Sequence, residues 1–227
     1  LVERYIRKDP NDIHQTRTAL ITYENADSDG QVRSLEYMKN IRQIADKYEL
    51  PIHLDGARIF NAATYLGVDV KEMAQYCDSI SVCLSKGLCA PVGTVLVGSK
   101  AFIDLARRKR KMLGGGMRQA GILAAAGMLA LSEMTKRLQE DHENAKYLVT
   151  RLKEVSGIEV LEERQQINMV FFCLKDYPLS ASALVQYMDA KNVRINGEDN
   201  GVMRFVTHNY VSRDEIDQVV QLLKDAK

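Results

Sequence analysis

The stretch SISVCLSKGLCAPVGTVLVGS, residues 79–99, places one lysine between two apolar runs. Residues 79–84 and 93–98 have the length and composition of buried β-strands. Lys86 follows the first run by two residues, in a short turn with no cluster of polar side chains around it. Because an unpaired buried ammonium group is costly, the pattern predicts a lysine that is paired, neutral or used covalently.

Strands and helices alternate before this stretch. Apolar runs at 19–23 and 50–55 predict two strands, and residues 34–48 between them have the periodicity of an amphipathic helix. Further helices are expected at 57–66 and 69–76. Such alternation is typical of an α/β fold with a mostly parallel sheet and right-handed crossovers.

Two charged residues follow the ends of predicted strands. Asp55 ends the strand at 50–55, and Lys86 lies just beyond the strand at 79–84. Ligands of such sheets bind beyond the carboxyl ends of the strands, so both side chains should face one crevice. One interpretation is a structural ion pair. The other is a site for pyridoxal phosphate (PLP), in which the amine condenses with the aldehyde and the carboxylate keeps the pyridine nitrogen protonated.

The second half of the chain has a different pattern. Residues 119–155 are almost continuously helical, first apolar and then charged, and beyond Gly157 short strands and helices alternate. The expected organisation is a truncated large domain at 1–132, a connecting helix at 133–156 and a small α+β domain at 157–227. The strands of the small domain are predicted at 158–161, 168–174 and 202–207, and its helices at 180–191 and 212–225.

Composition excludes several classes of protein. The 227 residues are 46% hydrophobic and 27% charged, with a formal net charge of +1, which gives no reason to expect nucleic acid or a membrane as a partner. The basic run at 107–111 fits the last turns of a helix, where cations suit the macrodipole. The longest apolar stretch, 120–131, is too short to span a bilayer.

The four cysteines indicate a reducing compartment. Residues Cys77, Cys83, Cys89 and Cys173 have neither CxxC spacing nor histidines placed for a zinc site, so no metal is expected. With no visible signal peptide, the cytoplasm is the predicted location. The first residue is Leu1 rather than methionine, which suggests a piece of a longer protein.

Three segments carry a family resemblance. HLDGARIFNA (53–62), CLSKGLCAPVGTVLVG (83–98) and RKMLGGGMRQAG (110–121) resemble, in order and spacing, segments of the threonine aldolases of the low-specificity or L-allo-threonine type. These are fold-type-I PLP enzymes that group with the β-eliminating lyases. The resemblance implies a large PLP-binding domain, a small C-terminal domain and a homotetramer built as a dimer of dimers.

The resemblance also implies roles for individual residues. Lys86 would bind PLP covalently, and Asp55 would hold the pyridine nitrogen. Arg58 would reach the cofactor's phenolate oxygen or the substrate carboxylate, although an arginine at a helix start can equally pair with a surface acid. Arg118 would lie near the phosphate of a cofactor, which could be the cofactor bound by a neighbouring subunit. The alternative is that Arg118 packs on a dimer surface. Arg204 would grip the substrate carboxylate through a bidentate contact, or else be an ordinary strand-face cation.

Two histidines lie close to these positions in the sequence. His53 is expected to pack against the sheet. His208, near Arg204 in the sequence, is expected to do the same, and the alternative is that it lines the entrance of the substrate site.

The chain departs from the family pattern at two places. After the first strand the family has ENTHN, whose histidine approaches the substrate's β-hydroxyl, whereas this chain has ENADS, with Asp27 in that position. Asp27 could accept a hydroxyl proton or be a plain turn residue. In addition, nothing in residues 1–18 supplies the family's glycine-rich phosphate turn or its ring-stacking histidine.

These expectations define one function and two alternatives. The expected activity is cleavage of threonine or allo-threonine to glycine and an aldehyde. The alternative within enzymes is β-elimination or racemisation with the same cofactor. The alternative from another class is a non-catalytic fragment of the fold that serves as a binding or assembly subunit.

Overall fold

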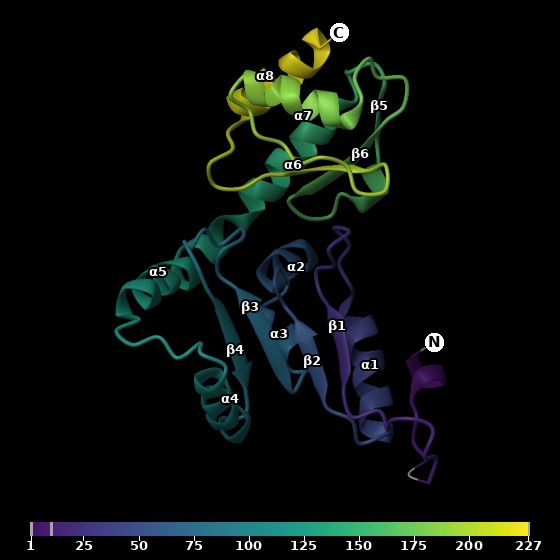
Figure 1. Cartoon of the computed structure of the whole chain (residues 1–227), viewed down its shortest axis with the longest axis vertical. Coiled ribbons are helices and arrows are strands. Elements are labelled where there is room, and N and C mark those ends of the chain that lie inside the picture. The colour runs from purple at the N-terminus through teal and green to yellow at the C-terminus, as the bar shows by residue number, and fades with distance from the viewer. Residues whose placement is uncertain (1, 10, 227) are drawn as a thin grey trace. The chain divides into compact units, whose positions relative to one another are not determined.

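The computed structural model describes residues 2–9 and 11–226. The chain divides into two compact units (Figure 1). Unit 1 spans Leu1–Asp27 and Val32–Thr135, and unit 2 spans Ser28–Gln31 and Lys136–Lys227. The short segment 28–31 therefore belongs to unit 2, although the chain on both sides of it belongs to unit 1.

Unit 1 is built on a four-stranded sheet. Its strands, in spatial order, are β1 (Ile21–Glu24), β2 (Ile52–Asp55), β3 (Ser79–Cys83) and β4 (Thr94–Gly98). β1, β2 and β3 are parallel, and β4 pairs with β3 in the antiparallel sense. The prediction of an α/β fold with a mostly parallel sheet is confirmed.

Helices connect the strands of unit 1. They are α1 (Leu35–Lys47), α2 (Ile59–Leu66), α3 (Val70–Ala74), α4 (Lys100–Met112) and α5 (Gly121–Ser132). A capping bond from the Tyr37 N–H to Ser34 Oγ, at 3.1 Å, begins α1. The buried side chains of α1 are Met38, Ile41 and Ala45, as its periodicity predicts.

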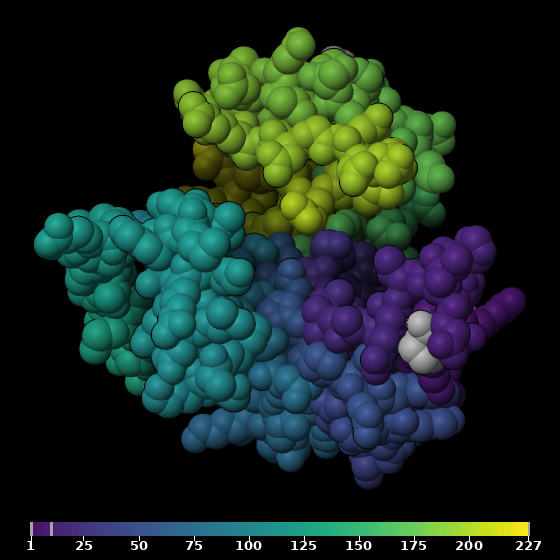
Figure 2. All heavy atoms as spheres, turned by 60° about the horizontal axis from the view of Figure 1, so that its bottom comes forward, coloured from purple at the N-terminus to yellow at the C-terminus, as the bar shows by residue number. Residues whose placement is uncertain are grey.

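The strand predicted at 93–98 is present, but the prediction that it is buried is wrong. Every residue of β4 is exposed, including Val95 at 36% and Val97 at 49%. The physical reason is that β4 is the last strand in the sheet order and that α4, the helix which follows it, has no buried residue to cover its side chains. α5 likewise exposes Ile122 and Met128, and residues of α4 and α5, in teal, cover a broad part of the surface of unit 1 (Figure 2).

The helix predicted across 119–155 is interrupted. α5 ends at Ser132, a 3₁₀ turn covers Met134–Arg137, and α6 runs over Leu138–Leu152. The division between the two units falls in this turn, between Thr135 and Lys136. Over the residues that the structure describes, no helix combines the length and apolar character that crossing a membrane requires.

Unit 2 packs helices against a small antiparallel sheet. The sheet contains β5 (Ile158–Val160), β6 (Met169–Leu174) and β7 (Met203–Val206), and the helices are α6, α7 (Ala181–Ala190) and α8 (Arg213–Asp225). Its core includes the fully buried side chains of Leu152, Phe172, Leu184, Met188 and Val220. A capping box formed by Ser212 and Glu215 begins α8, as the sequence predicts.

Candidate active site

The carboxyl ends of β2 and β3 place the two predicted key residues on neighbouring strands. Asp55 is the last residue of β2 and pairs in register with Ser81 of β3. Lys86 follows the end of β3 by three residues. Because the two strands are parallel, both residues lie at the same edge of the sheet.

The backbone around Asp55 is held firmly, while its carboxylate is open to solvent. Asp55 Oδ1 accepts the Ala57 N–H at 3.0 Å, and the Asp55 carbonyl accepts the Asn25 N–H at 3.1 Å. A Cβ at Gly56 would approach Ile80 Cγ2 to 2.8 Å, so the close approach of this turn to β3 requires a glycine. The result is a fixed carboxylate that a ligand can reach.

Lys86 is exposed. The cost of a buried ammonium group, from which the sequence predicts a paired, neutral or covalently used lysine, therefore does not apply to this chain. The turn after β3 is closed by the Cys89 N–H, which donates to the Lys86 carbonyl at 2.9 Å. Leu84, Leu88 and Ala90 are buried, so the apolar side chains of the turn point inward and the lysine points outward. Within residues 2–9 and 11–226, the Lys86 ammonium group has no hydrogen bond or ion pair, which leaves it accessible to an aldehyde.

Two further predicted residues lie on the same elements. His53, on β2, is half-buried, and its Nδ1 is 2.8 Å from Ser79 Oγ on β3, which fits packing against the sheet. Arg58 is half-buried at the N-cap of α2, three residues after Asp55. Its role toward the cofactor or substrate stays a prediction.

The loop after β1 holds Asp27 next to this edge. Asn25 is fully buried; its Nδ2 donates to the Arg33 carbonyl and its Oδ1 accepts the Arg33 N–H, both at 3.0 Å. These two bonds close the loop 25–33. Asp27 forms a salt bridge with the guanidinium of Arg33. The sequence reasoning missed Arg33, and the only signal for it was a lone arginine before the helix cap Ser34.

Arg118 lies in the exposed loop between α4 and α5. In the described chain it makes no hydrogen bond or ion pair, so nothing in unit 1 ties it to Asp55 or Lys86. The phosphate role that the resemblance gives to Arg118 stays a prediction.

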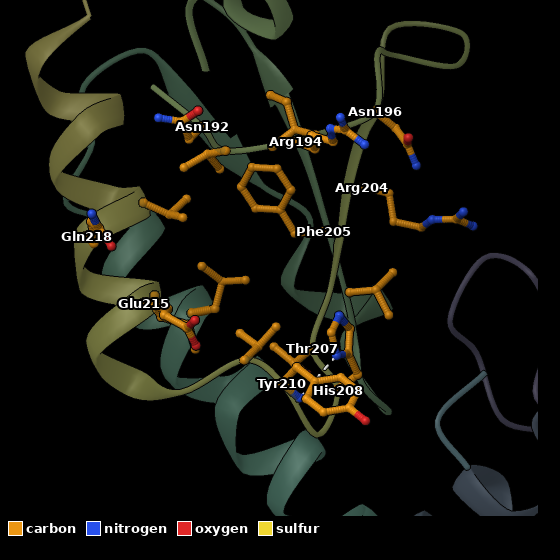
Figure 3. A pocket seen from close by; sticks show the side chains of 17 residues that line it. Asn192, Arg194, Asn196, Arg204, Phe205, Thr207, His208, Tyr210, Glu215 and Gln218 are labelled. Atoms are coloured by element: carbon orange, nitrogen blue, oxygen red, sulfur yellow. Dashed lines mark hydrogen bonds between the residues drawn. The ribbon is translucent and has the colours of Figure 1, made fainter. Parts of the chain in front are cut away.

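Arg204, on β7 of unit 2, borders a hollow of about 580 Å³. The hollow lies between β7, α8 and the segment 192–196, and Figure 3 shows the Arg204 side chain extending to the side of β7 away from α8. Nearby, His208 Nδ1 accepts the Tyr210 N–H at 3.2 Å. Arg204 is half-buried and joins none of the salt bridges among described residues, so its guanidinium is available to donate hydrogen bonds to a carboxylate.

The side chains at the carboxyl edge of unit 1 fit PLP in their chemistry. A covalent PLP site needs an accessible amine and an anion for the pyridine nitrogen. Lys86 supplies the first and Asp55 the second, from the ends of adjacent parallel strands. The searched residues include no group of histidine, cysteine and acidic side chains that could hold a metal ion.

The comparisons with known proteins match this chemistry. The family model of the beta-eliminating lyases matches residues 1–175. The low specificity L-threonine aldolase of Escherichia coli (strain K12) is 48% identical over 92% of this chain and 61% of that protein. The low-specificity L-threonine aldolase 1 of Arabidopsis thaliana is 39% identical over 99% of this chain and 64% of that protein.

The fold has counterparts among solved structures. The threonine aldolase of Leishmania major aligns with a TM-score of 0.72 and 18% identity, over 98% of this chain and 64% of that chain. At this identity the likeness concerns the fold, which is that of the fold-type-I PLP enzymes. The chain spans about three fifths of the length of the curated relatives that it matches.

Proposed function

Since the chain belongs to the beta-eliminating lyase family, we propose that it acts as a PLP-dependent aldolase. It cleaves a β-hydroxy-α-amino acid, threonine or allo-threonine, into glycine and an aldehyde. The observation that carries the proposal is that the exposed Asp55 ends β2, while the exposed Lys86 follows the end of the neighbouring parallel strand β3. The 48% identity to a low specificity L-threonine aldolase supports the choice of substrate.

Four residues of the chain hold the cofactor in this proposal. Lys86 would form the covalent bond, and the Asp55 carboxylate would accept the hydrogen bond that the protonated ring nitrogen donates. Arg58 would contact the phenolate oxygen and Arg118 the phosphate. When bound, PLP supplies an electron sink that stabilises a carbanion at the substrate's Cα. The hydrogen bond from the Ala57 N–H to Asp55 Oδ1 supports this role, because it orients the carboxylate.

Three side chains act on the substrate. Arg204 binds the α-carboxylate through its planar guanidinium, and Arg58 is the second cation that can do so. Asp27 accepts the proton of the β-hydroxyl, which allows the Cα–Cβ bond to break with release of the aldehyde. A proton returned to Cα then completes glycine.

The working form is proposed to be a cytoplasmic homo-oligomer, a dimer of dimers, that takes part in amino acid and glycine metabolism. The exposed apolar side chains of α5, among them Ile122, Met128 and Leu129, support association. The four cysteines are all free, which suits a reducing compartment.

One observation favours a second candidate. Asp27 stands where the family has an imidazole, and it is already paired with Arg33. If this carboxylate does not meet the substrate hydroxyl, the same cofactor site supports β-elimination or racemisation.

The test is cleavage of allo-threonine by the PLP-loaded chain, measured as acetaldehyde and glycine released. Lys86→Ala is expected to remove the activity, while Lys71→Ala, an exposed lysine on α3, keeps it. Serine and L-alanine, as substrates for elimination and racemisation, separate the second candidate. A colourless wild-type protein that does not bind PLP would contradict the proposal and favour a non-catalytic role.

A further inference from the structure

The loop 25–33 is a closed structure whose two ends are joined. Asn25 contacts both the N–H and the carbonyl of Arg33, and Ser34 directly after it caps α1. The Asn25 N–H also donates to the Asp55 carbonyl at 3.1 Å. The backbone of Arg33 is thus fixed at the carboxyl edge of the sheet, next to the strand that carries Asp55.

From this fixed position, the side chain of Arg33 reaches back across the loop. Its guanidinium pairs with Asp27 Oδ2, and it lies 5.8 Å from the centroid of the Tyr37 ring on α1. The Asp27 side chain is 18% exposed and that of Arg33 is 36% exposed. A half-buried pair of this kind is screened by solvent less than a fully exposed one.

Charged residues around the loop bear on the protonation of the Asp27 carboxyl group. Asp29 lies in the loop itself, and Glu24 pairs in register with Asp55 at the neighbouring strand ends. A like charge close to the Asp27 carboxyl group would favour its protonated form, because like charges repel. Arg33 contributes a cation in direct contact with Asp27 that opposes such repulsion. Arg58 at the start of α2 and Lys86 after β3 are further cations at this edge.

We propose that Arg33 is a positioning residue that keeps the Asp27 carboxylate charged and oriented at the carboxyl edge of the sheet. This inference rests on the proposed function, in which that carboxylate meets the β-hydroxyl of the substrate. A paired carboxylate stays ionised at a lower pH than an unpaired one, and the planar guanidinium fixes the direction of its oxygens. Arg33 therefore determines both the pH range and the geometry in which Asp27 acts.

The first experiment measures Asp27 directly, without any assay of activity. The carboxyl carbon of Asp27 is followed by carbon-13 NMR over a pH titration of the full chain, and its signal is assigned by its absence in Asp27→Asn. In Arg33→Met the titration midpoint of Asp27 should rise by about one pH unit. Arg33→Lys should recover most of the shift, and Lys39→Met, which removes an exposed cation from α1, should leave the midpoint unchanged.

The second experiment follows the same variants in allo-threonine cleavage. The acid limb of the kcat/KM profile should move upward in Arg33→Met and be partly restored in Arg33→Lys. Arg33→Gln serves as a second variant should Arg33→Met not fold. An unchanged Asp27 midpoint in the folded neutral variants would overturn the inference. If the Asp27 midpoint rises in Arg33→Met but the wild-type chain cleaves no β-hydroxy amino acid, the result would support the pairing and overturn the proposed function instead.

Discussion

Two aspartates differ in their surroundings: one lies at the carboxyl edge of the unit 1 sheet and the other in the interior of unit 2. They differ in exposure to solvent and in the groups that bind them. Asp55 is exposed, and among the described residues only the Ala57 N–H binds its carboxylate. Asp141 is completely buried on α6 and is bound by Arg137 at 2.6 Å. The Thr207 hydroxyl donates a hydrogen bond to the Asp141 backbone carbonyl at 2.6 Å. The Thr207 backbone carbonyl in turn accepts a hydrogen bond from Asn168 Nδ2 at 2.7 Å.

The difference separates charges that hold the fold from charges that are available for chemistry. Burial raises the pKa of Asp141, because desolvation disfavours the carboxylate, and Arg137 partly offsets this. The buried polar cluster (Asp141, His142, Asn168 and Thr207) is thus satisfied internally and invites no ligand. At the sheet edge, by contrast, the carboxylate and the amine of Lys86 remain open. Changes at the edge should alter activity, and changes in the cluster should alter stability.

The largest effect is expected from Asp55→Asn. A neutral amide cannot keep the pyridine nitrogen protonated, so turnover should fall by about a hundredfold or more while PLP still binds. The free energy of unfolding should hardly change, because the carboxylate is exposed. Kinetics, the visible spectrum and urea unfolding check the three parts.

The matched control for this change is Asp189→Asn, an exposed aspartate at the end of α7. It should leave turnover, cofactor binding and stability unaltered. Normal turnover in Asp55→Asn would remove Asp55 from its role, and a large loss of stability would erase the distinction between the two aspartates.

The next effect is expected from Arg137→Met, which leaves the Asp141 carboxyl group buried without its cation. Removing one member of a buried ion pair should lower the free energy of unfolding of unit 2 by about 3 kcal/mol. Amide NMR signals of α6 during urea unfolding report on unit 2 separately from unit 1. The double variant Arg137→Met/Asp141→Leu should recover part of the loss, since it buries no unpaired charge. A loss under about 1 kcal/mol in the single variant would show that the pair is not structural.

A smaller, pH-dependent effect is expected from His142, which is buried beside Asp141. Burial lowers the pKa of its imidazole to about 4, and Lys146 contributes in the same direction. The unfolded imidazole takes up a proton near pH 6.5, so below that pH the unfolded chain binds more protons than the folded one. The free energy of unfolding should therefore fall as pH drops from 7 to 5, by about 2 kcal/mol from this residue.

His142→Gln should remove this part of the pH dependence, and His14→Gln, at an exposed position, should keep it. The measurement is urea unfolding of unit 2 at several pH values between 5 and 7. Identical pH profiles for wild type and His142→Gln would contradict the assignment of a buried neutral histidine.

The strands and their ends could be predicted from sequence because short apolar runs bounded by turns determine them. Asp55 and Lys86 could therefore be placed at one edge before the structure was known. The exposure of Lys86 could not, since it depends on which side of the turn after β3 packs inward. The exposure of β4 depends on its place in the strand order, which an apolar run such as 93–98 does not encode.

Pairings between polar side chains were the least predictable part. Arg33 and Asp27 are six residues apart in a loop, where no helical or strand periodicity brings side chains together. Asp141 lies in a charged helical segment that resembles a solvated face. Its spacing from Leu138, Ala145 and Leu148 does follow the buried face of α6, and that spacing was the available signal.

The central claim is that the amine of Lys86 is the group that binds PLP, and peptide mapping tests it most directly. The chain is incubated with PLP, reduced with borohydride and digested, and the modified peptides are identified by mass spectrometry. The account predicts that the pyridoxyl group is found on the peptide containing Lys86, and that little is found on exposed lysines such as Lys71. A modification spread evenly over surface lysines, with Lys86 no more labelled than the others, would contradict it.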